Sequence, residues 1–403
     1  MAFFQIEIYS SGSGINRVYD DISDRLLLSK SSQLEEYIDE TEWDIFTFRP
    51  GNMTLVLDNK NHLFSKDSGR YDLASANNEI DVYWKENKSD SNSNRILLLK
   101  GEVNSETITE NVINRTVEFK INSPIFDMVK SEAPTDIFVS LFDPARHVYL
   151  HDLFILTPFP SPHDPFFDSS YRPEIPTNVY RTKRSFWNAF MNYNEVSRQQ
   201  KGIDLCKVLG VIPYYNYRNG RSELREREPD LSIAAAHHFS DDVLKVLRFE
   251  TGNKMIYNRV SGNSNNGFNN NESRNEVFSN SNGDNRQLDI NNNIVGFIEG
   301  TGSFSGTYPR LDYYWDSYKI VRPVFHIETE MNRQTLSVYP YDTVTLDQSI
   351  IQAELSRFGT AVFGQSVFES SSFFDTISGR FKVYGRKLNL KQQKIVFLLR
   401  KGV

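Results

Sequence analysis

The sequence predicts a mainly β protein with α+β elements, in which a small α/β unit joins two similar small β-barrels. Aromatic residues make up 13% of the 403 residues, with 29 Phe and 20 Tyr, and aromatic rings suit the pleated surface of a sheet. Short alternating apolar runs, separated by turn residues, recur toward both ends of the chain, as in all-β barrels and sandwiches. In addition, residues 95–122 and residues 379–400 share one strand–turn–strand design.

These two related segments each place a glycine inside their first strand. Gly101 interrupts the run 95–104, and Gly385 interrupts the run 380–388. A glycine within a strand is typical of a bulge or a sharp bend. The later segment continues with a dense apolar run at 394–399, which predicts burial on one or both faces. Two similar barrel endings in one chain favour an architectural element over an enzyme, and we expect the two barrels to superpose.

Residues 1–130 are predicted to form the N-terminal β-barrel. Alternating apolar positions within it are Phe4, Ile6, Ile8, Phe46, Phe48, Met53, Leu55, Leu57, Ile80, Val82 and Trp84. Polar residues at 58–61 predict a turn, and the polar run 87–94 predicts a hairpin tip. A short helix at 124–129, with proline near its first turn, is expected to lead out of the barrel.

A connector follows the first barrel. Residues 131–184 contain four prolines between positions 157 and 165, and such a run excludes regular structure there. The segment 131–184 is therefore predicted to be a Pro/aromatic-rich connector or insertion.

Residues 185–262 are predicted to form a small α/β domain. Ser185 is a suitable N-cap for a helix. Asn219-Gly220 predicts a hairpin between strands at 213–217 and 222–227, because both turn residues tolerate positive φ. Ser240 is expected to cap a helical turn, and strands are expected to follow at 249–250 and 255–260.

The last third of the chain is predicted to comprise a polar loop and the second barrel. Residues 263–319 are read as an Asn/Ser-rich loop and extension, because the stretch 261–293 has too little apolar surface to offset the entropy of ordering. Residues 320–403 are predicted to form the second β-barrel. It is expected to include a helix that is capped by Thr345 or Asp347 and ends at Gly359.

The net charge, the cysteine content and the lack of long apolar segments exclude several classes of protein. The net charge of −7 and the lack of a long basic run give no support for general nucleic-acid binding. The single cysteine, Cys206, excludes an internal disulfide and a cysteine-rich metal site, and fits assembly in a reducing cytoplasm. No signal-peptide pattern and no stretch of roughly 20 apolar residues is present, so we expect a soluble protein.

Candidate chemical sites are sparse, and we predict no catalytic, cofactor-binding or metal-binding residues. The histidine pair His237-His238 would point to opposite faces of a strand, so the two side chains rarely share a metal. The glycine cluster 300–306 lacks the lysine of a phosphate-binding loop and reads as a turn. Tyr313-Tyr314-Trp315 could stack on a sugar or a base, but an aromatic core or subunit contact is the favoured reading.

The remaining candidate site residues are acidic residues and a strand with alternating charges. Glycoside hydrolysis needs two facing carboxyl groups. The acidic positions considered are Glu35, Glu36, Asp39, Glu40, Glu42, Asp241 and Asp242. We expect them to lie in solvated loops or helix starts. The alternating charges at 221–228 fit either a solvated edge ladder or a partner surface. The chain is therefore predicted not to be an enzyme.

Several segments together resemble a known family. They are Val-Tyr-Asp-Asp-Ile-Ser-Asp-Arg at 18–25, the strand and turn at 53–65, Glu-Ile-Asp-Val-Tyr at 79–83, Leu-Leu-Lys-Gly-Glu-Val at 98–103, the middle unit through 253–260, and the closing strands from 379–383 to 397–400. In this order they are similar to the phage tail and baseplate hub proteins of tailed phages and related injection systems. Residues 131–184 and 261–293 have no counterpart in that resemblance.

The resemblance implies a structural virion protein: a homotrimeric hub at the tail tip that adapts a sixfold tube to a threefold tip. Three chains with two barrels each would present six similar surfaces around a ring. Implied partners are a tail tube or distal tail protein ring above, a spike, fibre or tip protein below, and a tape-measure protein or DNA passing through the lumen. No sequence-specific nucleic-acid binding, membrane segment or cofactor is implied. Assembly would occur in the bacterial host cytoplasm.

Two alternatives remain open. A hexameric distal tail protein has a similar first barrel, although the second barrel ending would then be redundant. A carbohydrate-binding or carbohydrate-degrading tail protein rests on the aromatic cluster 313–315 and the acidic pairs. For the hub, lumen-facing side chains are expected to be neutral or acidic, because basic groups would bind phosphates and slow the passage of DNA.

Overall fold

The structure is a computed structural model that describes residues 3–11, 17–37, 49–65, 70–74, 78–123, 211–218, 221–226, 234–250, 259–264, 276–279, 287–292, 323–347 and 379–401. In this part of the chain nearly all regular structure is β, as predicted. No helix among the described residues is long and apolar enough to cross a membrane.

The strands of the first third are β1 (Phe3–Ser11), β2 (Val18–Asp21), β3 (Leu34–Tyr37), β4 (Arg49–Asp58), β5 (Glu79–Lys85), β6 (Ile96–Asn111) and β7 (Thr116–Asn122). Short 3-10 turns lie at η2 (Ser23–Arg25), η3 (Lys60–His62) and η4 (Asn92–Asn94). The turn η3 overlaps the segment 58–61, where a polar run predicted a turn, and η4 lies within the segment 87–94, where a polar run predicted a hairpin tip.

The remaining elements are β8 (Val211–Asn216), β9 (Arg221–Glu226), β10 (His237–Phe239), β11 (Val243–Glu250), β12 (Arg259–Ser264), β13 (Glu276–Ser279), β14 (Gln287–Asn292), β15 (Val324–Glu330), α6 (Arg333–Leu336), β16 (Thr343–Leu346), β17 (Arg380–Asn389) and β18 (Lys394–Lys401). The helix α6 is a single turn. It begins with a capping box in which the Asn332 side chain accepts from the N–H of Thr335 and the Thr335 hydroxyl accepts from the N–H of Asn332.

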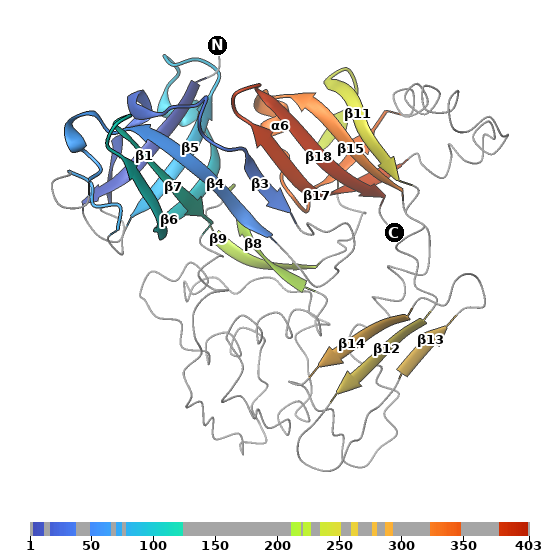
Figure 1. The fold of residues 1–403 in the computed structure, drawn as a ribbon. Helices are drawn as coiled ribbons and strands as arrows, with labels where there is room; N and C mark the ends of the chain where they lie inside the picture. Colours follow the sequence, from blue (N-terminus) through green and yellow to red (C-terminus); the bar gives the residue numbers. More distant parts are fainter. Residues whose placement is uncertain are drawn as a thin grey trace.

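One 13-stranded sheet unites the two ends of the chain. Its order is β11-β15-β18-β17-β3-β4-β7-β6-β5-β1-β2, with β16 also on β17 and β10 on β16 (Figure 1). All pairs are antiparallel except β10 with β16. The segments predicted as separate barrels are thus hydrogen-bonded to each other through β3 and β17. Sequence alone did not indicate this link.

Alternating apolar residues form the core of each half. Those predicted from the alternation and now found buried are Phe4, Ile6, Ile8, Met53, Leu55, Leu57, Ile80, Val82 and Trp84. In the closing strand β18, Ile395, Phe397 and Leu399 are buried on one face. Period-two burial follows from the pleat, because successive side chains point to opposite faces of a sheet.

Both glycines of the repeated design lie where another strand passes too close for a side chain. A Cβ at Gly101 would lie 2.4 Å from the carbonyl oxygen of Asn122, and one at Gly385 would lie 2.3 Å from Cδ1 of Tyr37. The predicted irregularity is present at Gly385, where the β17–β18 register shifts. In β6 the register shift with β7 falls between Asn104 and Thr109 instead.

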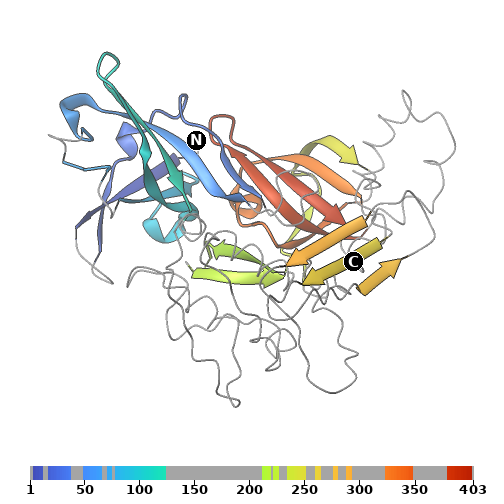
Figure 2. The same ribbon diagram turned by 60° about the horizontal axis from the view of Figure 1, so that its bottom comes forward.

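The hairpin predicted around residues 219–220 is confirmed. Strands β8 and β9 pair antiparallel from Val211 opposite Glu226 to Asn216 opposite Arg221. Figure 2 shows this hairpin below the large sheet, near the boundary of its two halves.

Two local predictions are wrong, and one alternative of a third is excluded. Residues 241–242 form a turn that leads into β11, so Ser240 caps no helix; its N–H donates to Oδ1 of Asp242 at 3.0 Å. Of the two residues predicted to cap a later helix, Thr345 lies in β16 and is excluded, while the residues that follow Asp347 lie outside the described part of the chain. The polar stretch 261–293 contains parts of the three-stranded sheet β13-β12-β14, because backbone hydrogen bonds can order a chain that has few apolar side chains.

Other predicted features lie outside the described residues. These are the helix at 124–129, the connector 131–184, the helix from Ser185, the glycine cluster 300–306, the aromatic cluster 313–315 and the helix ending at Gly359.

Candidate functional site

The site that connects the two halves of the sheet is the pairing of β3 with β17, which we call the seam. Its register places Arg386 opposite Glu36 and Lys387 opposite Glu35. Adjacent residues of a strand face opposite sides, so one charge pair lies on each face of the sheet. The Lys387–Glu35 pair lies at 2.5 Å and is partly exposed, whereas the other pair is buried.

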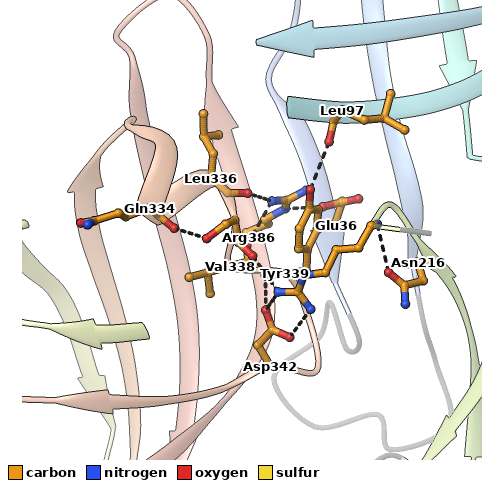
Figure 3. A network of polar contacts seen from close by, with 11 residues as sticks. Glu36, Leu97, Asn216, Gln334, Leu336, Val338, Tyr339, Asp342 and Arg386 are labelled. Carbon is orange, nitrogen blue, oxygen red and sulfur yellow. Dashed lines mark hydrogen bonds and ion pairs between the residues drawn. The ribbon is translucent and has the colours of Figure 1, made fainter. Parts of the chain in front are cut away.

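Arg386 is the centre of the buried face of the seam. Its side chain is fully buried, and Glu36 is only 5% exposed. Arg386 Nε donates to Oε2 of Glu36. Arg386 Nη1 donates to the carbonyl oxygens of Leu336 and Val338, both at 3.1 Å. Figure 3 shows the guanidinium between the carboxylate from β3 and the carbonyl groups at the end of α6 and just after it.

The electrostatics of Arg386 favour its charged form despite burial. Desolvation opposes the charge, but the adjacent Glu36 carboxylate more than offsets it, so the pKa of Arg386 lies above its ordinary value. The ring of Tyr339 also lies 4.1 Å from the guanidinium carbon, within the range of a cation–π contact. The Tyr339 hydroxyl in turn donates to the carbonyl of Leu97 in β6 at 3.3 Å. Residues from both halves of the sheet therefore converge on one cation.

The loop after α6 is held by Asp342. Its carboxylate accepts from the N–H of Tyr339 at 2.8 Å. It also binds both terminal nitrogens of Arg218, with Nη1 to Oδ1 at 2.9 Å. Arg218 Nη2 additionally donates to the carbonyl of Ser337 at 2.7 Å. A bidentate arginine–carboxylate pair fixes direction as well as distance, so Arg218 ties the end of β8 to this loop.

Tyrosines of the β8 segment pack over the seam. Tyr214 meets the ring of Tyr341 edge-on at 4.9 Å, and Tyr217 stacks on Tyr339 at 5.9 Å. Burial, aided by the charge of Glu36, raises the pKa of Tyr217 well above its ordinary value. A Cβ at Gly51, in β4, would lie 2.9 Å from the Tyr217 hydroxyl. The segment thus contacts the N-terminal half through Gly51 and the C-terminal half through Arg218 and the tyrosine rings.

A second group of polar and charged residues lies on β5 and β6 and at the start of β2. Glu79 accepts from Arg17 and from the Tyr19 hydroxyl. Burial opposes ionisation of Glu79, but these hydrogen bonds and the Lys100 charge lower its pKa. Burial raises the pKa of Asp81, two residues along β5. Each carboxylate has partners in the sheet, and this group stabilises the polar face of the N-terminal half.

The two histidines of the pair at 237–238 have separate protein partners. His237 Nε2 lies 2.5 Å from Oδ2 of Asp242, and His238 Nδ1 lies 2.7 Å from Oγ1 of Thr345. Burial opposes the charge of Asp242, but its bonds to His237 and to the Ser240 N–H lower its pKa. Across the described ranges, no three His, Cys, Asp or Glu side chains are grouped to hold a metal ion.

The expectation of solvated acidic residues is wrong for Glu35 and Glu36, which lie in β3. Asp39, Glu40 and Glu42 lie outside the described residues, and so do the side chains of β9 in the charged stretch 221–228. Asp241 is exposed, as expected. Sequence analysis missed Arg386, Arg218 and Asp342. No local signal distinguished Arg386, because β17 also contains Arg380, Lys382 and Lys387.

Comparison with known proteins gives structural matches only. No protein-family model and no curated protein matches the sequence. A tail protein from Neisseria meningitidis MC58 is similar in structure, with a TM-score of 0.51 and 9% identity over 99% of this chain and 96% of that protein. A prophage tail protein from Listeria monocytogenes EGD-e has a TM-score of 0.52 and 8% identity over 99% and 94%. At such low identity these matches establish the fold, and the chain has the mainly β fold of phage tail proteins.

Proposed function

We propose that the chain is a structural subunit of a phage tail tip: a homotrimeric hub that joins a sixfold tail tube to a threefold tip and forms part of the DNA-ejection conduit. The observation that carries the proposal is the duplicated strand–turn–strand ending, β6–β7 and β17–β18, within one continuous sheet. Each copy of the ending has a glycine in its first strand, at a close approach to another strand. Three chains would present six such units through head-to-tail contacts that close a ring.

The seam supports this role because a ring with near-sixfold symmetry needs its two halves at a fixed relative orientation. The buried Arg386–Glu36 pair, the backbone pairing of β3 with β17 and the Arg218–Asp342 clamp all act across or beside the seam. Removing one partner of a buried pair leaves an uncompensated charge, so alternative orientations that separate the pair are disfavoured.

The protein is proposed to be structural rather than catalytic. Glu36 and Asp342 are both engaged by arginines, which supports a structural role for these two carboxylates. The proposed neighbours are a tube or distal tail ring above and a spike, fibre or tip protein below, with a tape-measure protein or DNA in the lumen.

The test is copy number and symmetry. Native mass spectrometry of the purified chain should give three times the 46.7 kDa protomer mass, and averaging of assembled tails by electron cryo-microscopy should give a threefold ring. Six copies per ring would instead identify a distal tail protein. A single copy in the assembled particle, or a lumen lined by Lys and Arg, would refute the conduit.

A further inference from the structure

Large apolar side chains are exposed at three places in the described part of the chain. Val112 and Ile113, at 69% and 94% exposure, form the tip of the β6–β7 hairpin; Leu244 and Leu247, each at 42%, lie on β11; and Val18, at 50%, begins β2. Single exposed apolar residues are ordinary on protein surfaces. The tip and β11 differ from that background because each presents two of them together.

The β6–β7 hairpin is acidic, and hydrogen bonds hold its stem in place. The N–H of Asn59 donates to the carbonyl of Arg115 at 2.7 Å, and Asn59 Nδ2 donates to Oε1 of Glu110 at 2.9 Å. These bonds hold the stem of the hairpin against the turn η3. Residues 106–118 contain three glutamates and one arginine, a net charge of −2. The two apolar side chains therefore project from a fixed stem with an acidic border.

In the edge strand β11, each exposed leucine is followed by a basic residue. Its pairing with β15 shifts register between Val243 and Lys245 and again between Val246 and Arg248. The skipped residues are Leu244 and Leu247, so both leucines occupy β-bulge positions. Lys245 and Arg248 each directly follow one of these leucines, and Lys245 lies 3.6 Å from the Glu328 carboxylate.

We propose that the β6–β7 tip of one copy of this chain docks on the Leu244–Leu247 surface of a second copy. The inference rests on the proposed ring and specifies its contact. Val112 and Ile113 would cover the two leucines, and the glutamates of the stem would face Lys245 and Arg248. Apolar anchors surrounded by complementary charge are typical of the energetic centre of an interface.

The contact must join different copies because the two surfaces are far apart within one chain. Six inter-strand steps separate β7 from β11 in the sheet. Both ribbon views show the hairpin and β11 in different halves of the molecule (Figures 1 and 2). Two different surfaces per copy make a heterologous contact, the kind that closes rings.

Bulges also favour side-chain docking over strand addition at this edge. A regular edge strand invites pairing with another strand, whereas a bulge twists the edge and interrupts its row of hydrogen-bonding groups. With two bulges in eight residues, β11 is a poor template for strand addition. Its re-aimed leucines instead form a surface that a projecting tip can cover.

Disulfide trapping on the full-length chain tests the contact. In a Cys206→Ser background, one tagged chain carries Ile113→Cys and a differently tagged chain carries Leu247→Cys. Oxidation of the mixture should give a covalent dimer with both tags, since a disulfide requires Cα atoms within about 7 Å. A chain with both cysteines should give a covalent trimer. Val18→Cys, similarly exposed but on the other edge strand, is the matched control and should not be trapped with Ile113→Cys.

The outcomes separate this contact from the trimer itself. A native trimer without the Ile113–Leu247 cross-link overturns the contact while the proposed hub stands, and a monomer overturns both. Equal trapping with the Val18→Cys control, trapping of Ile113→Cys with itself, or trapping to another tail protein in particles also overturns it. As a second measurement, Ile113→Asp should raise the trimer dissociation constant by about tenfold or more with an unchanged melting temperature of the protomer. An unchanged dissociation constant contradicts the proposal.

Discussion

Glu36→Gln is the most informative perturbation of the seam, because it removes a charge without removing volume. Arg386 is fully buried in the folded protein, and Glu36 is the carboxylate paired with it. The two carbonyl bonds to Leu336 and Val338 would remain but carry no compensating charge. Leaving a buried cation unpaired typically costs about 3–5 kcal/mol, and we expect a loss in that range.

The adjacent residue supplies a matched control. Glu35→Gln makes the same chemical change one position earlier in β3, but its partner Lys387 has a side chain 38% exposed. Exposed pairs contribute about 0–1 kcal/mol, so this variant should change stability little. Urea unfolding followed by far-UV circular dichroism would measure both free energies. Equal effects of the two substitutions would refute the argument that burial makes the seam pair important.

A double variant separates charge from packing. Glu36→Gln with Arg386→Met removes both charges and retains an unbranched side chain in the core. Replacing a buried ion pair by apolar groups is often neutral, so the double variant should recover a large part of the stability lost in Glu36→Gln alone. If the double variant is as unstable as the sum of the two single variants, the pair is not coupled as the structure indicates.

Three further predictions concern close packing, the clamp and acid stability. Gly385→Ala places a Cβ 2.3 Å from a tyrosine ring carbon and should destabilise the protein by about 1–3 kcal/mol; an unchanged melting temperature would contradict the close approach. Arg218→Lys replaces the bidentate contact with Asp342 by a single point charge, so amide hydrogen exchange in β8 and β9 should accelerate. Unchanged protection of these amides would show that Arg218 does not hold the hairpin in place. The pKa of Asp242 beside His237 is lowered from 3.8 in the folded protein, so its contribution to stability is present above that value and is lost as the pH falls through the folded-state pKa. The stability difference between wild type and Asp242→Asn should therefore shrink below about pH 4. A difference that stays constant with pH would count against a stabilising Asp242–His237 pair.

Local patterns in the sequence were sufficient to place most of the described strands. Alternation of apolar residues identified β1, β4, β5 and β18, because burial of one face of a pleated strand imposes a period of two. The Asn219-Gly220 turn located the β8–β9 hairpin. Gly101 and Gly385 were recognised as special positions, although only one of them coincides with a register shift. Where the polar composition of 261–293 predicted a loop, backbone pairing of β12, β13 and β14 formed a sheet.

Tertiary structure alone decided how the two halves meet. Glu36 and Arg386 are 350 positions apart in the chain, and nothing local to either residue distinguishes a buried partner from a solvated one. The same holds for Arg218 and Asp342, which are 124 positions apart. The alternation of apolar residues and the β-propensity of a segment indicate which face of a strand is buried. The order of the strands and the choice of pairing partner depend instead on which distant surfaces become buried together. The sequence therefore determined most of the strands, the turn and the glycine positions, while the seam and its charges follow from long-range pairing in the folded sheet.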